Sequence, residues 1–101
     1  MLTITFMTKL KKILDKFYAN PAGLNYWHIE KLLIAFGCVR IPAKGSHVKF
    51  KHHSAKSDLI IPIHNRDCKE FYKKNALKFI KENNLKINHE KNTQALHHDE
   101  Q

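Results

Sequence analysis

The spacing of the hydrophobic residues changes from helical to strand-like and back, and this change most constrains the fold. Apolar residues recur every three or four positions over residues 6–17 and again over 29–36. Over residues 46–52 the period is two, which places alternate side chains on opposite faces of a strand. A helical period returns after residue 67. The chain therefore predicts helices on both sides of a block of strands.

Residues typical of turns and caps separate these periodic segments. The sequence Asn20-Pro21-Ala22-Gly23 ends the first helix, and Asn25 is a candidate N-cap for the second. Gly37 stands where a left-handed residue commonly follows a helix. Asp67 and Glu70 have the spacing of a capping box, which predicts the start of the last helix.

Three strands are predicted, over residues 39–41, 46–52 and 59–63. Pro62 cannot donate a hydrogen bond to a neighbouring strand, so the third strand is expected at an edge of the sheet or with that nitrogen facing outward. The order α-α-β-β-β-α predicts an α+β fold, a three-stranded antiparallel sheet packed against helices. Five residues are expected to share one core: Phe50, Leu59, Ile61, Leu33 and Phe79.

The length of 101 residues fits one small domain. We expect a single domain over residues 1–85 with an N-terminal helical extension, followed by a polar, disordered tail over residues 86–101. No apolar run approaches the roughly 20 residues needed to cross a bilayer, so no membrane segment is expected. With two cysteines and no recognisable signal peptide, a reducing cytoplasm is the expected compartment.

The net charge of +9 favours a polyanionic partner, and the strand over residues 46–52 is where such a partner would bind. Alternation places His47, Lys49 and Lys51 on the face opposite Phe50. An imidazole beside ammonium groups suits proton transfer on a phosphodiester, because histidine can move a proton and lysines can stabilise charge on the phosphate. The same pattern also fits a solvated basic face without chemistry.

The sequence contains further candidate groups outside this strand. His64 leaves the third strand on the face of His47 if the two strands pair, where it is a second candidate for proton transfer or a capping residue at the strand end. The histidine and cysteine spacings match no metal-binding motif, so no metal and no cofactor are expected. Tyr26 and Trp27, at the start of the second helix, are expected to serve in core and hinge packing rather than to stack on bases.

These residues also carry a resemblance, over about residues 9–85, to the HicA-type toxins of bacterial toxin–antitoxin pairs. Its motifs are Asn20-Pro21, Trp27-x-x-Glu30-Lys31-Leu32-Leu33, Phe36-Gly37, Gly45-Ser46-His47-x-x-Phe50-x-His52, Ile61-Pro62-Ile63-His64 and Lys69-Glu70-Phe71-Tyr72-Lys73-Lys74. One departure is Tyr72-Lys73-Lys74-Asn75 where family members often have Gly-Thr-Leu, and another is the additional front helix. These departures bear on substrate preference and toxicity more than on the fold.

The resemblance implies a fold similar to double-stranded-RNA-binding domains and a metal-independent endoribonuclease (an mRNA interferase) that is silenced by a HicB-like antitoxin. The catalytic histidine of the family falls on His47, with His64 as a possible second catalytic residue. The implied substrate is single-stranded or messenger RNA in the cytoplasm. The residues expected to contact the RNA are Lys44, Gly45, Ser46, Lys49, Lys51 and His52.

A second interpretation stays open from the sequence. The same basic strand face would also serve a non-catalytic RNA- or DNA-binding module that only holds phosphates. Composition does not separate the two interpretations, because both need basic residues. RNA cleavage by the pure protein distinguishes them.

Overall fold

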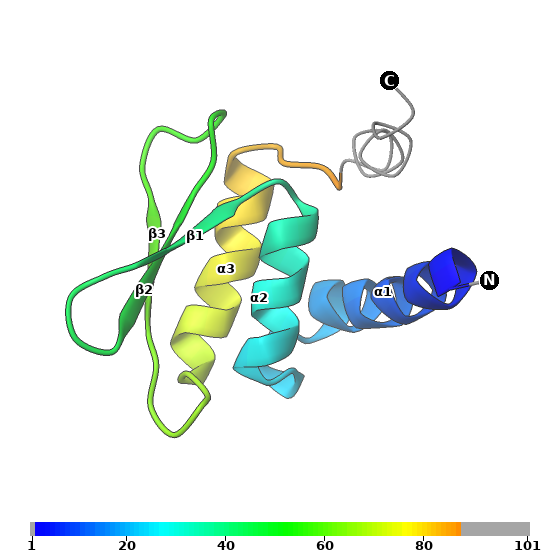
Figure 1. Ribbon diagram of the computed structural model, residues 1–101, viewed down its shortest axis with the longest axis horizontal. Helices are drawn as coiled ribbons and strands as arrows, with labels where there is room; N and C mark the ends of the chain where they lie inside the picture. Colours follow the sequence, from blue (N-terminus) through cyan, green and yellow to red (C-terminus); the bar gives the residue numbers. More distant parts are fainter. Residues whose placement is uncertain (1, 88–101) are drawn as a thin grey trace.

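A computed structural model describes residues 2–87 of the chain, with side chains from residue 8 onward. The elements are α1 (Leu2–Ala19), a 3-10 helix η1 (Pro21–Gly23), α2 (Tyr26–Ala35), β1 (Val39–Pro42), β2 (His47–Lys51), β3 (Leu59–Pro62) and α3 (Glu70–Glu82). Figure 1 shows this order, which confirms the predicted α-α-β-β-β-α arrangement and the α+β fold class.

The strands form one antiparallel sheet in the order β1-β2-β3, so β2 is the central strand. In this register His47 lies opposite Pro62 and Phe50 lies opposite Leu59. Pro62 lies on β3, an edge strand, as predicted. No strand pairs with the outer side of β3, so the N–H that proline lacks is not needed there.

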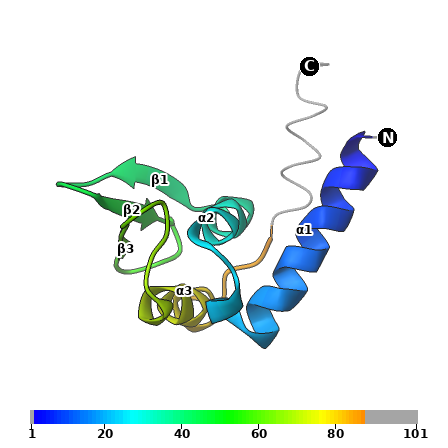
Figure 2. The ribbon, with the colours of Figure 1, turned by 90° about the horizontal axis from the view of Figure 1, so that it is seen from below.

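Helices α2 and α3 cover one face of the sheet and leave the other face open, as Figure 2 shows. The five residues predicted to share a core are all buried in one cluster, with exposures of 8% or less. The two predicted from the helices, Leu33 and Phe79, come from α2 and α3. Packing therefore fixes one face of β2 and presents the opposite face to solvent.

The first helix lies beside η1 and α2, on the side away from the sheet (Figure 2). Its predicted apolar stripe is confirmed at Leu10 and Phe17, which are buried, whereas the side chains of Phe6 and Met7 lie outside the described residues. Residues 88–101 also lie outside them, so the disorder expected of residues 86–101 stays a prediction. No helix within residues 2–87 is long and apolar enough to span a membrane.

The helix caps agree with the sequence at α2 but not at α3. The side chain of Asn25 accepts the N–H of His28 at 3.1 Å, and Gly37 adopts the expected positive φ of 94°. The predicted capping box is wrong: α3 begins after Lys69, whose side chain makes no capping hydrogen bond. The Asp67 carboxylate accepts hydrogen bonds from Tyr26 N and Cys68 N instead, and the first of these caps α2.

Candidate nucleic-acid interface

The central strand β2 presents its basic side chains on the open face of the sheet. Val48 and Phe50 are buried beneath the sheet, whereas His47 and Lys51 are exposed and Lys49 is half-buried. The alternation predicted from the sequence is therefore correct. It places one imidazole and two ammonium groups on a face that no helix covers in Figure 2.

One carboxylate that was not predicted from the sequence shares this basic face. The Nζ atoms of Lys49 and Lys51 lie 3.9 and 4.0 Å from Oδ2 of Asp58. Asp58 precedes β3, and since Phe50 pairs with Leu59, Asp58 lies opposite Lys51. The sequence did contain a signal for this position. Asp58 is two residues before Ile60, and residues two apart lie on the same face of a strand. Asp58 reduces the positive charge that the two lysines present.

His47 lies at the start of β2 and lines two hollows in the surface. One hollow, of about 480 Å³, lies over the β1–β2 turn and is lined by Lys44, Gly45, Ser46 and Ile60 among others. Gly45 has a φ of 68°, which the turn requires and a side chain would disfavour. The predicted RNA-contacting residues of this turn therefore lie together, beside His47.

The second hollow at His47, of about 400 Å³, is lined by residues that were not predicted to lie near His47. Trp27, Arg40 and Arg66 line it together with His47. The expectation of core packing is correct for Tyr26, which is fully buried, but wrong for Trp27, whose exposure is 50%. The first residue of α2 turns into the core, and the second therefore turns outward.

Arg40 is held in place by a short polar chain that begins in the core. The hydroxyl of Tyr26 donates to Oε1 of Glu30 at 2.6 Å, and Nε of Arg40 donates to the same oxygen at 2.7 Å. Burial, followed by the hydrogen bond to Glu30, raises the pKa of Tyr26 well above its usual range, so the hydroxyl stays protonated and donates. Glu30, which is bonded to a buried tyrosine, thus holds the Nε atom of a residue that lines the hollow.

Arg66 belongs to a tight turn between β3 and α3. His64 and Asp67 exchange two backbone hydrogen bonds of 2.8 and 2.9 Å, and Asn65 and Arg66 between them have φ values of 51° and 63°. Asparagine tolerates this left-handed region, whereas arginine rarely adopts it. The turn therefore holds Arg66 in an unusual backbone conformation at the edge of the hollow.

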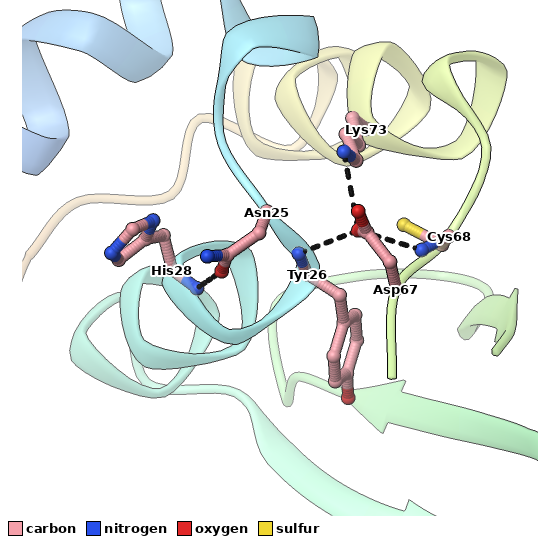
Figure 3. A network of polar contacts seen from close by, with 6 residues as sticks. All are labelled: Asn25, Tyr26, His28, Asp67, Cys68 and Lys73. Atoms are coloured by element: carbon pink, nitrogen blue, oxygen red, sulfur yellow. Dashed lines mark hydrogen bonds and ion pairs between the residues drawn. The ribbon is translucent and has the colours of Figure 1, made fainter. Parts of the chain in front are cut away.

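Asp67 attaches this turn to the start of α2. Figure 3 shows its carboxylate between the backbone N–H groups of Tyr26 and Cys68 and the ammonium of Lys73. Partial burial alone would raise the pKa of Asp67, but the three donors outweigh it and lower that pKa below its usual value. Because Tyr26 precedes Trp27 and Asp67 follows Arg66, this contact brings the indole and the guanidinium to one hollow.

The remaining histidines are placed differently from His47. The ring of His52 accepts the N–H of Ser54 at Nδ1 (3.0 Å), so Nε2 carries the proton and donates to the Phe36 carbonyl at 3.1 Å. His52 thus joins the end of α2 to the loop after β2, and its contact with RNA stays a prediction. His64 is exposed in its turn and is not among the described residues that line either hollow at His47.

Both cysteines, Cys38 and Cys68, are buried and unbridged, so they pack as small core residues. Burial raises the pKa of the Cys38 thiol to about 11, so it stays protonated. Within residues 2–87, no group of three His, Cys, Asp or Glu side chains is arranged to hold a metal ion.

A comparison with protein families assigns the chain. A family model described as "HicA toxin of bacterial toxin-antitoxin" matches residues 28–81, just over half of the chain. The chain belongs to the HicA toxin family. Searches of curated proteins and of solved structures each found no match.

Membership makes this HicA chain a toxin of a toxin–antitoxin system, generally an RNase that cleaves mRNA, with a cognate antitoxin as partner. The matched stretch contains the whole sheet, most of α2 and most of α3. It begins one residue after Trp27, so neither that indole nor α1 lies within the stretch that carries the family assignment.

Proposed function

We propose that this HicA toxin is a metal-independent endoribonuclease that uses His47 as its general base on single-stranded messenger RNA in the cytoplasm. The observation that carries the proposal is the position of His47. Its imidazole is exposed at the start of β2, next to the Lys44-Gly45 turn and on the same sheet face as Lys49. A phosphodiester lying across this face would meet a proton acceptor and positive charge together.

The chemistry follows from a neutral imidazole beside a ribose 2′-hydroxyl. His47 would take the hydroxyl proton, and the 2′-oxygen would attack the adjacent phosphorus while the bond from phosphorus to the 5′-oxygen breaks. The products are a 2′,3′-cyclic phosphate and an RNA end with a 5′-hydroxyl. No electrons are exchanged with an outside acceptor, so the reaction needs no redox partner. The 5′-oxygen has to receive a proton as it leaves.

Two residues are candidates for the donor of that proton. His64 fits by residue type, but its place in the turn after β3 puts it outside the hollows that His47 lines. The ammonium of Lys44 belongs to a residue that lines the same hollow as His47. We retain His64 as a second proton-transfer candidate and add Lys44 as the lysine beside His47.

The phosphates of the RNA would be held by the basic residues on the open face and in the turn. Lys49 and Lys51 already contact Asp58, so a phosphate would compete with that carboxylate for them. Contacts of this kind position the strand and do not select its sequence. Gly45 and Ser46 would contribute backbone N–H groups and a hydroxyl next to His47.

We further propose a HicB-like antitoxin that covers this face with acidic residues over Lys44, Lys49 and Lys51. The face also exposes Val39 and Ile60 at 60% and 48%, which a protein partner would bury. A partner seated there would block RNA and complement the positive charge. An antitoxin that binds elsewhere and leaves RNase activity unchanged would contradict this placement.

The test of the proposed function is cleavage of a defined RNA by the purified protein, with and without a chelator. We expect the same rate in both, products ending in a 2′,3′-cyclic phosphate, and no cleavage of the matching DNA, which lacks the 2′-hydroxyl. A rate that the chelator abolishes would overturn metal independence. Binding without any cleavage would favour the alternative, a non-catalytic RNA- or DNA-binding module.

A further inference from the structure

We propose that the hollow formed by Trp27, Arg40 and Arg66 beside His47 binds one nucleotide of the RNA next to the cleaved bond, with its base stacked on the indole of Trp27. This inference rests on the proposed function, because it takes RNA as the ligand. It adds a site that sequence reasoning did not find and that includes a residue outside the stretch matched to the family.

The indole of Trp27 is the first reason. The exposure of Trp27 is 50%, whereas its neighbour Tyr26 is fully buried, and tryptophan is on average a highly buried residue. Tyr26 contacts it edge-on, with ring centroids 5.5 Å apart and planes at 64°. An exposed aromatic side chain supported in this way is suited to stack on a nucleobase, a contact that tolerates any base.

The charge of the hollow is the second reason. Two guanidinium groups line it, and none of the described residues in its lining is acidic. Glu30 engages the Nε atom of Arg40, but a guanidinium has five N–H donors, so donors remain for a phosphate. The combination of an aromatic surface with two arginines matches a nucleotide, which offers a base and a phosphate.

The third reason is that the structure fixes these groups relative to one another at a cost. Arg66 has a φ of 63°, where glycine would be favoured over arginine. Asp67 then ties its turn to the start of α2 through the 2.9 Å bond from Tyr26 N. A side chain kept in an unfavourable backbone conformation at the edge of a hollow indicates a role for that side chain.

The size and location of the hollow agree with this ligand. Its volume of about 400 Å³ lies within the range of small-molecule sites, roughly 300–1,000 Å³. His47 lines both this hollow and the hollow over the turn, and the two hollows also share Ala43, Gly45 and Ser46. A strand crossing His47 would therefore place one nucleotide against Trp27 and the next over the Lys44-Gly45 turn.

Trp27 is the only tryptophan of the chain, so its fluorescence reports on this hollow directly. The probes are short 2′-O-methyl RNA oligonucleotides of each base, which no 2′-hydroxyl mechanism can cleave. We expect saturable quenching of the tryptophan on binding. The variants lack tryptophan, so their affinity is measured with a fluorescent label on the oligonucleotide. Trp27→Ala should weaken binding about 5- to 150-fold, whereas Trp27→Phe should keep most of the affinity.

Two further variants sharpen the test. Arg66→Gly removes the guanidinium while keeping a residue that favours the positive φ, so we expect weaker binding, a flatter salt dependence by about 0.7 log units per log unit, and no loss of stability. Tyr18 is an exposed aromatic residue of α1 that does not line the hollow. The matched control is therefore Tyr18→Ala, which should leave binding unchanged.

The outcomes separate this inference from the proposed function. Binding that neither quenches the tryptophan nor changes in Trp27→Ala would overturn the inference, even if the toxin cleaves RNA as proposed. Quenching by the antitoxin alone, with none by the oligonucleotides, would assign the hollow to the protein partner and also overturn it. Quenching of the wild-type tryptophan together with weaker binding by Trp27→Ala, but no cleavage of natural RNA, would support the nucleotide site and overturn the nuclease proposal.

Discussion

The Asp67 carboxylate accepts the backbone N–H of Tyr26 at 2.9 Å, although 41 positions separate the two residues in the chain. This bond joins the turn after β3 to the first residue of α2. It also satisfies the free N–H of Tyr26 at the start of that helix, where the Asn25 side chain caps the N–H of His28. Arg66 and Trp27, which line one hollow, are each next in the chain to a residue of this bond.

Loss of this carboxylate should destabilise the protein. Asp67→Ala removes hydrogen bonds from Tyr26 N and Cys68 N and leaves the buried ammonium of Lys73 without its 3.2 Å partner. We expect a loss of about 1.5–3 kcal/mol in the free energy of unfolding, measured by urea denaturation. Asp15→Ala removes an exposed partner of Lys11 and should cost about 0–1 kcal/mol. Equal effects of the two substitutions would contradict the assigned role.

The same carboxylate should make stability depend on pH in the acid range. Its pKa is lowered in the folded protein, so its contribution is complete above the unfolded value of about 3.9 and disappears as the pH falls through the folded pKa. We therefore expect wild type to exceed Asp67→Asn in unfolding free energy by a constant amount above about pH 5. The difference should shrink below about pH 4. A difference in unfolding free energy that grows as the pH falls would contradict a lowered pKa of Asp67.

The core of the sheet offers a test of the fold itself. Phe50 is fully buried beneath β2, whereas Phe71 on α3 is 67% exposed. Phe50→Ala should cost about 3–5 kcal/mol, because it leaves a cavity between the sheet and the helices. Phe71→Ala should change stability by less than about 1 kcal/mol, as surface substitutions generally do. Similar midpoints in thermal unfolding for both variants would be inconsistent with this core.

The fold was predictable from the sequence where periodicity and turn chemistry agreed. The alternation around Phe50 placed β2 and its buried face correctly, and Asn25 and Gly37 marked the ends of α2. The capping box failed at Asp67 because the spacing of an acidic pair carries no information about a donor 41 positions away. A local pattern could not show that this carboxylate caps a different helix.

The candidate site was predictable only in part, for the same physical reason. His47 and the lysines follow from alternation along one strand. Trp27, Arg40 and Arg66 come from α2, β1 and a turn, so only the packed structure brings them to one hollow. Trp27 adjoins a buried tyrosine, and helical periodicity alone did not distinguish which of the two aromatic residues faces the core.

The contact of Asp58 with two lysines leads to a prediction about RNA affinity. Asp58→Asn removes a negative charge about 4 Å from Lys49 and Lys51, so RNA should bind about two- to fivefold more tightly at low salt. Lys49→Ala and Lys51→Ala should each weaken binding of all sequences and flatten the salt dependence by about 0.7 log units per log unit. The matched control is Lys78→Ala on α3, which should leave RNA binding unchanged. Weaker binding by Asp58→Asn would show that this carboxylate helps the interface rather than opposing it.

The central claim is that His47 accepts the 2′-hydroxyl proton. The most direct measurement is the single-turnover rate of cleavage of one RNA by wild type and by His47→Ala, with the affinity of both for the 2′-O-methyl form of that RNA measured separately. We predict that the rate falls about 10²- to 10⁴-fold while the affinity changes by less than about tenfold. Cleavage by His47→Ala at the wild-type rate would contradict the claim.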